Sequence, residues 1–170
     1  MDSYENWSAL RGRVLAMPLD RQAAFALACA QGALGPDVES LSALIELGWD
    51  ALLDGGDVSQ AVTELKNDPY LDDDPVAATY YALSSLQGEA GAAWWAASRA
   101  MDLAFSRVDY PSGAQVFRPL EVDARTTVVQ AEIARQARLL ETVESAPNLA
   151  LSVSRLSNDQ NLWMALGGVT

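Results

Sequence analysis

The order of hydrophobic and polar residues follows a helical period along almost the whole chain. Apolar residues recur every three or four positions, and no run before the C-terminal region alternates as a half-buried strand does. A first helix is predicted over residues 3–16 by the spacing of Trp7, Leu10, Val14 and Met17. Pro18 ends it, and an alanine-rich second helix in RQAAFALACAQGAL is expected to stop at Gly35-Pro36.

Four more helices are predicted in the middle of the chain. The third runs over about residues 37–53 and has a core stripe of Val38, Leu41, Ile45, Gly48 and Leu52. Gly55-Gly56 ends it. A short amphipathic helix in DVSQAVTELKN comes next, then helices in PVAATYYALSSLQ and in EAGAAWWAASRAMDLAFSRV. The turn-rich segment DYPSGAQVFRP, residues 109–119, is expected to be a loop.

The longest helix is predicted over residues 119–144, with Pro119 in its first turn. Its core stripe is Val122, Thr126, Val129, Ile133, Gln136, Leu140 and Val143. Its charged residues of mixed sign are expected on a solvated face, namely Glu132, Arg135, Arg138 and Glu141. Residues 146–170 fit strand and helix spacing about equally well. The prediction is one all-α domain, a bundle of about six to seven helices over residues 1–145 with a C-terminal tail, residues 146–170, on it.

The composition excludes several kinds of active site. The chain has no histidine and one cysteine, so neither a histidine-based triad nor an ordinary zinc site is available within it. Cys29 lies in an apolar run and is expected in the core. Any catalysis would rest on carboxylates, arginines, tyrosines, Lys66 or a bound hard cation. We therefore predict no catalytic residue, no metal ligand and no cofactor.

The N-terminal residues have neither a basic segment nor an apolar one of the kind that signal peptides carry. The longest apolar runs are far shorter than the ~18 residues of a membrane span. The expected location is therefore the cytoplasm, without membrane association.

Negative charge is concentrated in one third of the sequence. Residues 37–89 contain twelve acidic residues and one basic residue, Lys66, so they carry −11 of the net −12. Such a balance disfavours nucleic-acid binding and docking on anionic membranes, both of which need clustered lysine and arginine. A basic protein is the natural electrostatic partner.

The acids of the third helix are predicted to share one face. A period of about 100° per residue places five of them within about 80°, opposite Leu41, Ile45 and Leu52. These five are Glu39, Glu46, Asp50, Asp54 and Asp57. Two like-charge pairs four residues apart destabilise this helix, by roughly 0.2–0.5 kcal/mol each. Partner binding explains why such a face would be kept, and solubility alone is the simpler alternative.

The segment KNDPYLDDDPVAA, residues 66–78, contains four more aspartates. Asp68 before Pro69 is typical of a turn, and Asp74 before Pro75 is expected to cap the helix that follows. Asp72 and Asp73 have no such local role, so they are assigned to the acidic surface. The predicted partner-binding residues are Glu39, Glu46, Asp50, Asp54, Asp57, Asp72 and Asp73.

Other constellations fit known sites less well. The four aspartates lack the alternate spacing, central glycine and distal glutamate of a calcium loop. Glu141 and Glu144 form an ExxE pair, as in all-α pyrophosphatases, but the only matching pair is Asp54 and Asp57 across two glycines. In the pair Trp94-Trp95, the first fits the core stripe and the second is expected at a boundary, as a groove filler or an interface anchor.

The order of several segments resembles the YjaG-like family, bacterial proteins mainly of unknown function. The resemblance rests on RQAAFALACAQGALGP, LIELGWDALLDGGD, DDDPVAATYYALSSLQGEAGAAWWAASRAMDLAF, EVDARTTVVQAEIARQARLLETVES and PNLAL. It covers roughly residues 5–153, and the residues after Leu156 extend beyond it. The resemblance implies a compact cytosolic helical bundle and supplies no catalytic residues.

The sequence therefore predicts a non-catalytic, acidic helical protein that binds another protein. The most specific version is an immunity or antitoxin-like protein that neutralises a basic toxin. Two alternatives stay open: a small-molecule or metal-dependent carboxylate enzyme, and a housekeeping protein whose acidic surface serves only solubility.

Overall fold

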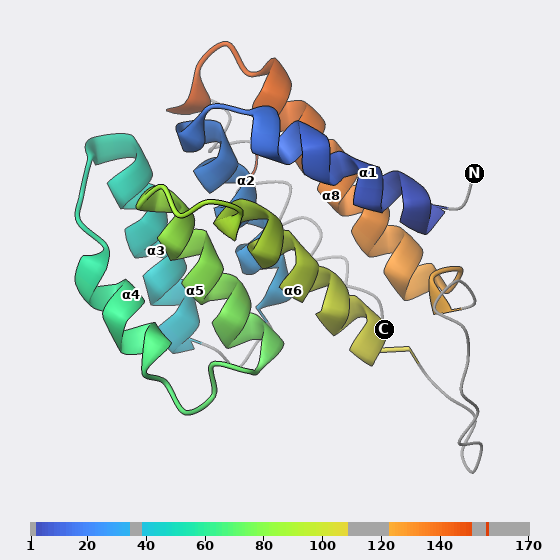
Figure 1. Cartoon of the computed structure of the whole chain (residues 1–170), viewed down its shortest axis with the longest axis horizontal. Coiled ribbons are helices and arrows are strands. Elements are labelled where there is room, and N and C mark those ends of the chain that lie inside the picture. The colour runs from blue at the N-terminus through green and yellow to red at the C-terminus, as the bar shows by residue number, and fades with distance from the viewer. Residues whose placement is uncertain (1–2, 35–38, 109–122, 151–155, 157–170) are drawn as a thin grey trace.

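The computed structural model of the protein describes residues 3–34, 39–108, 123–150 and 156 (Figure 1). These residues form seven α-helices and no strand. The helices are α1 (Ser3–Ala16), α2 (Leu19–Ala33), α3 (Glu39–Asp54), α4 (Ser59–Lys66), α5 (Asp74–Leu86), α6 (Ala92–Ser106) and α8 (Thr127–Ser145). The all-α prediction is confirmed.

Helix α2 is the centre of the bundle. It contacts α1, α3, α5, α6 and α8, and ten of its fifteen residues are buried. Most of these are alanines, whose small side chains let several helices approach the α2 backbone at once. Phe25 and Leu27 fill the larger spaces between them and are fully buried. The expected core position of Cys29 is confirmed, since its side chain has no exposed surface.

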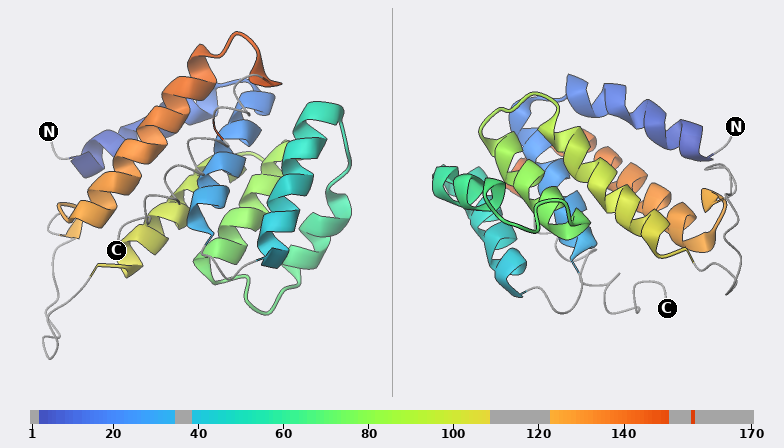
Figure 2. Two further views of the ribbon diagram at one scale, coloured as in Figure 1. Left: turned by 180° about the vertical axis from the view of Figure 1, so that it is seen from behind. Right: turned by 60° about the horizontal axis from the view of Figure 1, so that its bottom comes forward.

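The other helices lie on two sides of α2 (Figure 2). Helices α3, α4 and α5 form one side, and α1 and α8 lie together on the other, with α6 between α5 and these two. Helices α3 and α5 run in the same direction, and so do α1 and α8. This arrangement leaves the outer face of α3 uncovered by any other described helix.

Gly48 lets α3 approach its neighbours closely, as its place on the core stripe indicates. A Cβ atom there would lie 2.5 Å from Leu27 of α2 and 2.8 Å from Leu83 of α5. Both distances are far shorter than carbon atoms tolerate, so a larger residue would displace the Leu27 and Leu83 side chains or push α3 outward. The role of Gly48 is packing.

The start of the longest helix differs from the prediction. Helix α8 begins at Thr127, because Asp123–Thr126 form a turn in which the Thr126 amide donates to the Asp123 carbonyl at 3.0 Å. Thr126 has an extended backbone, with ψ of 150°, which a continuous helix excludes. The predicted stripe residues Val129, Ile133, Gln136, Leu140 and Val143 are buried.

Several predictions fall outside the described residues. They concern the 109–119 loop, the helix stop at Gly35-Pro36, the stripe residues Val38 and Val122, and most of the tail. Of residues 146–170 the structure describes 146–150 and 156, and among these Ala146 and Leu156 are buried in the bundle. No helix among the described residues is both long enough and apolar enough to cross a bilayer.

Candidate functional site

Four carboxylates form a line along the outer face of α3, which we call the acidic stripe: Glu39, Glu46, Asp50 and Asp54. All four are exposed, and the opposite face of α3 is buried through Leu41, Ile45 and Trp49. At about 1.5 Å per residue the stripe is about 22 Å long. The structure therefore places these four predicted residues together on one accessible face.

The acidic stripe has no internal compensation in the described part of the protein. None of its four carboxylates forms an ion pair or a side-chain hydrogen bond there. The described ion pairs lie elsewhere and join Arg13 to Glu144, Arg99 to Asp74 and Arg135 to Glu132. Each like-charge pair within the stripe therefore destabilises α3 without a described partner to offset it.

Asp72 and Asp73 lie beside the N-terminal end of α3. They line a shallow groove of about 410 Å³ together with Asp74, Leu41 of α3, Val76 of α5 and Leu103 of α6. The groove thus combines three carboxylates with aliphatic surface. Leu41 lies in the first turn of α3, on the face opposite the stripe, so the groove and Glu39 lie at the same end of α3 on different faces.

Asp57 does not belong to the face on which it was predicted. Helix α3 ends at Asp54, so Asp57 lies in the connection to α4. Its Oδ1 accepts hydrogen bonds from the Ser59 hydroxyl at 2.6 Å and the Ser59 amide at 2.8 Å. Both bonds lower the pKa of Asp57, the bond from the hydroxyl more than the bond from the amide. Asp57 therefore organises the start of α4.

Asp68 and Asp74 have separate local roles. Asp68 Oδ1 accepts from the Tyr70 amide at 2.8 Å, which confirms the predicted turn. The predicted cap at Asp74 is wrong, because the N-cap position is Asp73 and Asp74 is the first residue of α5. The Asp74 carboxylate instead pairs with Arg99 of α6 at 3.4 Å. The pair joins the first turn of α5 to α6.

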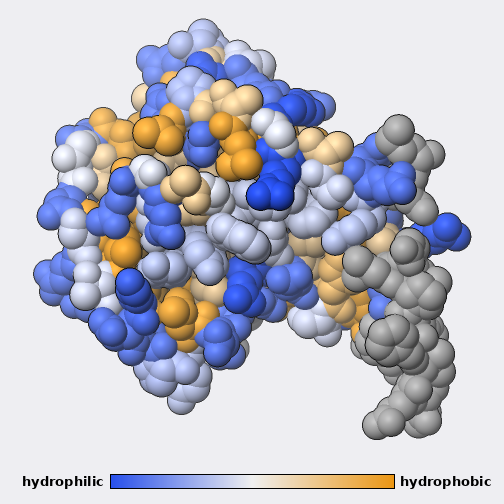
Figure 3. All heavy atoms as spheres, viewed as in Figure 1, coloured by the Kyte–Doolittle hydropathy of each residue, from blue (hydrophilic) through white to orange (hydrophobic). Residues whose placement is uncertain are grey.

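Exposed hydrophobic side chains accompany the acidic residues. Leu47 and Leu53 of α3 are 39% and 44% exposed and flank the stripe, and Tyr70, two residues before Asp72, is 65% exposed. Figure 3, viewed from the side on which α5 lies in front of α3, shows apolar residues reaching the surface in separate patches among hydrophilic ones. Apolar groups mixed with charges are typical of protein interfaces.

A second cavity, of about 290 Å³, lies between α5 and α6. It is lined by Tyr81, Trp95, Ser98, Arg99 and Asp102. The predicted division of the tryptophan pair is confirmed, since Trp94 is buried and Trp95 is 52% exposed. Loss of hydration raises the pKa of Asp102, the charge of Asp74 raises it further, and Arg99 acts against both.

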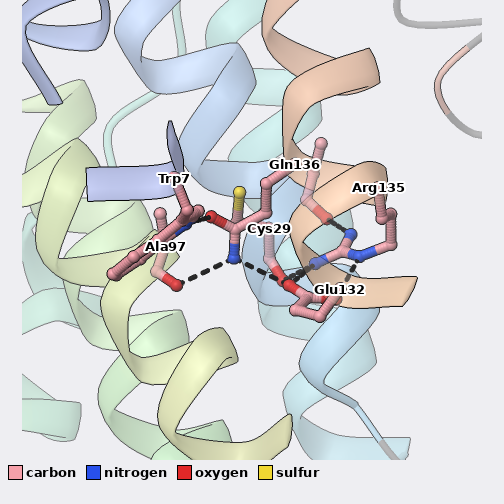
Figure 4. Close-up of polar contacts among 7 residues, drawn as sticks. Trp7, Cys29, Ala97, Glu132, Arg135 and Gln136 are labelled. Carbon is pink, nitrogen blue, oxygen red and sulfur yellow. Dashed lines mark hydrogen bonds and ion pairs between the residues drawn. The ribbon is translucent and has the colours of Figure 1, made fainter. Parts of the chain in front are cut away.

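A buried polar network joins α8 to the rest of the bundle (Figure 4). Arg135 donates to both oxygens of Glu132, at 2.6 Å each, and to the Ala28 and Cys29 carbonyls of α2 at 3.1 and 3.4 Å. Gln136 donates to Glu132 Oε1 at 2.7 Å and to the Ala97 carbonyl of α6 at 2.9 Å. The indole of Trp7 in α1 donates to Gln136 Oε1 at 2.7 Å. The network therefore connects α1, α2 and α6 through α8.

The expectation that Glu132 and Arg135 are solvated is wrong, since both are buried. Burial alone would lower the pKa of Arg135, but the charge of Glu132 and their hydrogen bond outweigh it and raise that pKa. Gly32 makes room for the guanidinium, because a Cβ there would lie 2.2 Å from Arg135 Nη1. The sequence contained one sign of this network: Gln136 lies on the predicted core stripe, and a buried amide needs polar partners nearby. The network is enclosed, so its role is structural.

The ExxE pair of α8, Glu141 and Glu144, is in contact with α1 through one of its two residues. Glu144 is bound by Arg13 of α1, through Nη2 at 2.5 Å and Nε at 3.2 Å, and Glu141 is exposed. Across the described ranges, no three His, Cys, Asp or Glu side chains are grouped so that they could hold a metal ion.

Comparisons with protein-family models, with curated proteins and with solved structures find no match to this chain.

Proposed function

We propose that this protein binds a basic protein through the acidic stripe of α3 and the adjoining groove at Asp72 and Asp73. The observation that carries the proposal is the lack of compensation along the stripe. Four exposed carboxylates follow one helix face with no ion pair in the described residues, whereas three acids elsewhere each bind an arginine. A partner with lysine and arginine at matching positions would relieve the repulsion within the stripe.

The groove is suited to a single basic side chain. Leu41, Val76 and Leu103 offer aliphatic surface for a lysine or arginine stem, and Asp72 and Asp73 offer carboxylates for its charged end. Leu47, Leu53 and Tyr70 would contribute apolar contact around the charges. Charge complementarity would speed association, and these apolar contacts would slow dissociation.

The most specific form of this proposal is an immunity or antitoxin-like protein that neutralises a basic toxin. If the toxin acts on nucleic acid, the carboxylates of the stripe would occupy the surface that otherwise binds phosphates. The resemblance to the YjaG-like family bears on the fold and adds no support to this function.

The test compares two charge-reversed proteins of equal net charge. One carries Glu46→Lys, Asp50→Lys and Asp54→Lys; the control carries Glu5→Lys, Asp20→Lys and Glu141→Lys, three exposed acids on other helices. Each is used, beside the unchanged protein, to capture partners from extracts of its native cells at low and at high salt. We expect a basic protein to bind the unchanged protein and the control at low salt, and not the stripe variant.

A captured protein that is not basic, or that binds the stripe variant as well as the control, would contradict the proposal. For the toxin version, the captured protein is expressed with and without this one. Growth arrest that this protein relieves, and that the stripe variant does not relieve, is the expected result. If no basic partner is captured at low salt, the proposal fails and the two alternatives remain, a carboxylate enzyme and an acidic surface that serves only solubility.

A further inference from the structure

The cavity between α5 and α6 combines aromatic surface with an incompletely balanced charge. Tyr81 and Trp95 both line it, with ring centroids 6.3 Å apart and ring planes tilted by 34°. Trp95 is 52% exposed, an unusual position for the largest side chain in proteins. Aromatic faces carry partial negative charge and attract cations. The aromatic part of the site therefore favours a cationic group.

The charged residues of the cavity favour the same kind of group. Arg99 is held by Asp74 at 3.4 Å, so this pair is nearly neutral as a unit. Asp102 then contributes one negative charge that no described ion pair balances. The three residues together have a formal charge of −1. A ligand with a single positive charge would neutralise the site.

We infer that this cavity binds a guanidinium group, the arginine side chain of a protein partner. A guanidinium is planar and weakly hydrated, so it stacks on an aromatic ring while its edge donates two hydrogen bonds to one carboxylate. Trp95 or Tyr81 would supply the ring, Asp102 the carboxylate, and the Ser98 hydroxyl a further acceptor. An ammonium group has no planar face and would use only part of this arrangement.

The position of the cavity indicates that the arginine belongs to a protein. Asp74 lines the groove that also contains Asp72 and Asp73. Its ion-pair partner Arg99 lines the cavity at Trp95, so the groove and the cavity are neighbours. A basic partner in the groove would bring further basic side chains within reach of Trp95. The inference thus rests on the proposed function for its source of arginine, but the chemistry of the cavity can be tested alone.

The first test titrates the protein with arginine blocked at both ends and follows the indole N–H signals by NMR. The signal of Trp95 is identified by its loss in Trp95→Phe. We expect this signal to move more than those of the other tryptophans. Asp102→Asn should weaken binding about tenfold, because it removes the carboxylate at constant shape. Glu5→Gln, which makes the same change of charge on an exposed residue of α1, should leave binding unchanged.

A second variant moves the affinity in the opposite direction. Arg99→Gln removes the competing cation, so binding of blocked arginine should tighten by about threefold or more. A purely structural role of Arg99 in holding Asp74 would predict equal or weaker binding. Weaker binding in Arg99→Gln, or an unmoved Trp95 signal, would overturn the inference.

Two further ligands identify the bound chemistry and its source. Blocked lysine should bind more weakly than blocked arginine, and equal binding would overturn the guanidinium assignment. Free arginine should bind no better than the blocked form, and a clear preference for it would overturn the assignment to a protein side chain. The stripe variant of α3 should bind blocked arginine normally. Failure of the inference is therefore distinct from failure of the proposed function.

Discussion

Arg135 is one of two arginines that attach α8 to α2, the other being Arg21, which donates to the Glu144 and Ala146 carbonyls at 2.8 and 2.7 Å. The guanidinium of Arg135 is buried, pairs with Glu132 and donates to two carbonyls within the last turns of α2. Those carbonyls lie near the negative end of the α2 dipole, where a cation is favourable. A buried charge is tolerated only while its partner is present, so the two residues must be considered together.

Arg135→Met is expected to lower the free energy of unfolding by about 3–5 kcal/mol, because it leaves the Glu132 carboxylate buried without its cation. Adding Glu132→Gln should recover most of this loss, since the amide oxygen can still accept from Gln136 and no charge remains buried. Urea denaturation followed by circular dichroism measures both. A double variant as unstable as the single one would show that Arg135 acts through its contacts with α2.

Cys29 gives a pH dependence of known sign. Burial raises the pKa of its thiol from 9.0 to about 12, with Arg135 opposing and Glu132 adding to the rise. Above pH 9 the unfolded thiol loses its proton while the folded one keeps it. The free energy of unfolding therefore falls as pH rises, by about 1.4 kcal/mol per pH unit from this group.

The Cys29→Ala variant removes this contribution. Urea denaturation at pH 8, 9, 10 and 11 should show that the variant loses less stability than the unchanged protein above pH 9, whatever its stability at pH 8. The other titrating groups are the same in both proteins, so the difference in slope isolates the thiol. Parallel pH profiles would contradict the buried position of Cys29.

At the scale of helices, the spacing of apolar residues predicted the buried face correctly where only one face of a helix packs on the rest of the bundle. The outline of α3 and its buried stripe follow directly from Leu41, Ile45 and Gly48. The spacing failed to identify all buried residues where other helices pack on several sides of a helix. In α8 the positions of Glu132 and Arg135 are polar by type yet buried, because Gly32 of α2 leaves room for a guanidinium. That complementarity arises only when the two helices meet.

The ends of helices were predicted less well than their faces. Pro119 is favourable in a first turn, but the turn at Asp123–Thr126 decides where α8 begins. Asp74 precedes Pro75, as a capping residue would, yet Asp73 occupies the N-cap position of α5 and Asp74 pairs with Arg99. Local preferences of roughly 1 kcal/mol are easily overridden, in α8 by a neighbouring turn and at Asp74 by an ion pair to another helix.

The like charges of the acidic stripe make α3 less stable than it would be with charges of both signs on that face. Asp50 has a like charge four residues away on each side, Glu46 and Asp54. Asp50→Lys replaces two repulsive pairs by two attractive ones and should raise the free energy of unfolding by about 1 kcal/mol at low salt. Near 1 M salt, where screening acts over about 3 Å, most of the gain should disappear.

Urea denaturation at both salt concentrations measures this effect, with Glu5→Lys as the control for net charge. The same Asp50→Lys variant should bind the basic partner more weakly. Greater stability together with weaker binding is the expected result of a face kept for recognition. No gain in stability at low salt would show that the carboxylates do not repel one another in the folded protein.

At the scale of the molecule, the sequence specified an all-α bundle because helical spacing and small residues recur along the chain, with half of its residues hydrophobic. It did not specify which helix is central. The alanine-rich segment of α2 is as hydrophobic as several others, and its position follows from its small side chains, which let α3, α5, α6 and α8 all approach it. Likewise, the cavity at Trp95 depends on how α5 and α6 cross.

Central and peripheral helices should therefore differ in local stability. An amide exchanges with solvent when its helix opens, and opening α2 would separate every helix that packs on it. Helix α4 has only eight residues and packs mainly on α5. It can open while the rest of the bundle stays folded.

Hydrogen exchange followed by mass spectrometry or NMR should accordingly find the slowest amides in α2, close to the limit set by global unfolding, and the fastest helical amides in α4. Helices α5 and α6, which pack on α2 and on each other, should exchange almost as slowly as α2. Arg135→Met should speed exchange in α8 more than in α5, because the lost contacts join α8 to α2. Equal protection of α2 and α4 would mean instead that the bundle opens only as a single unit.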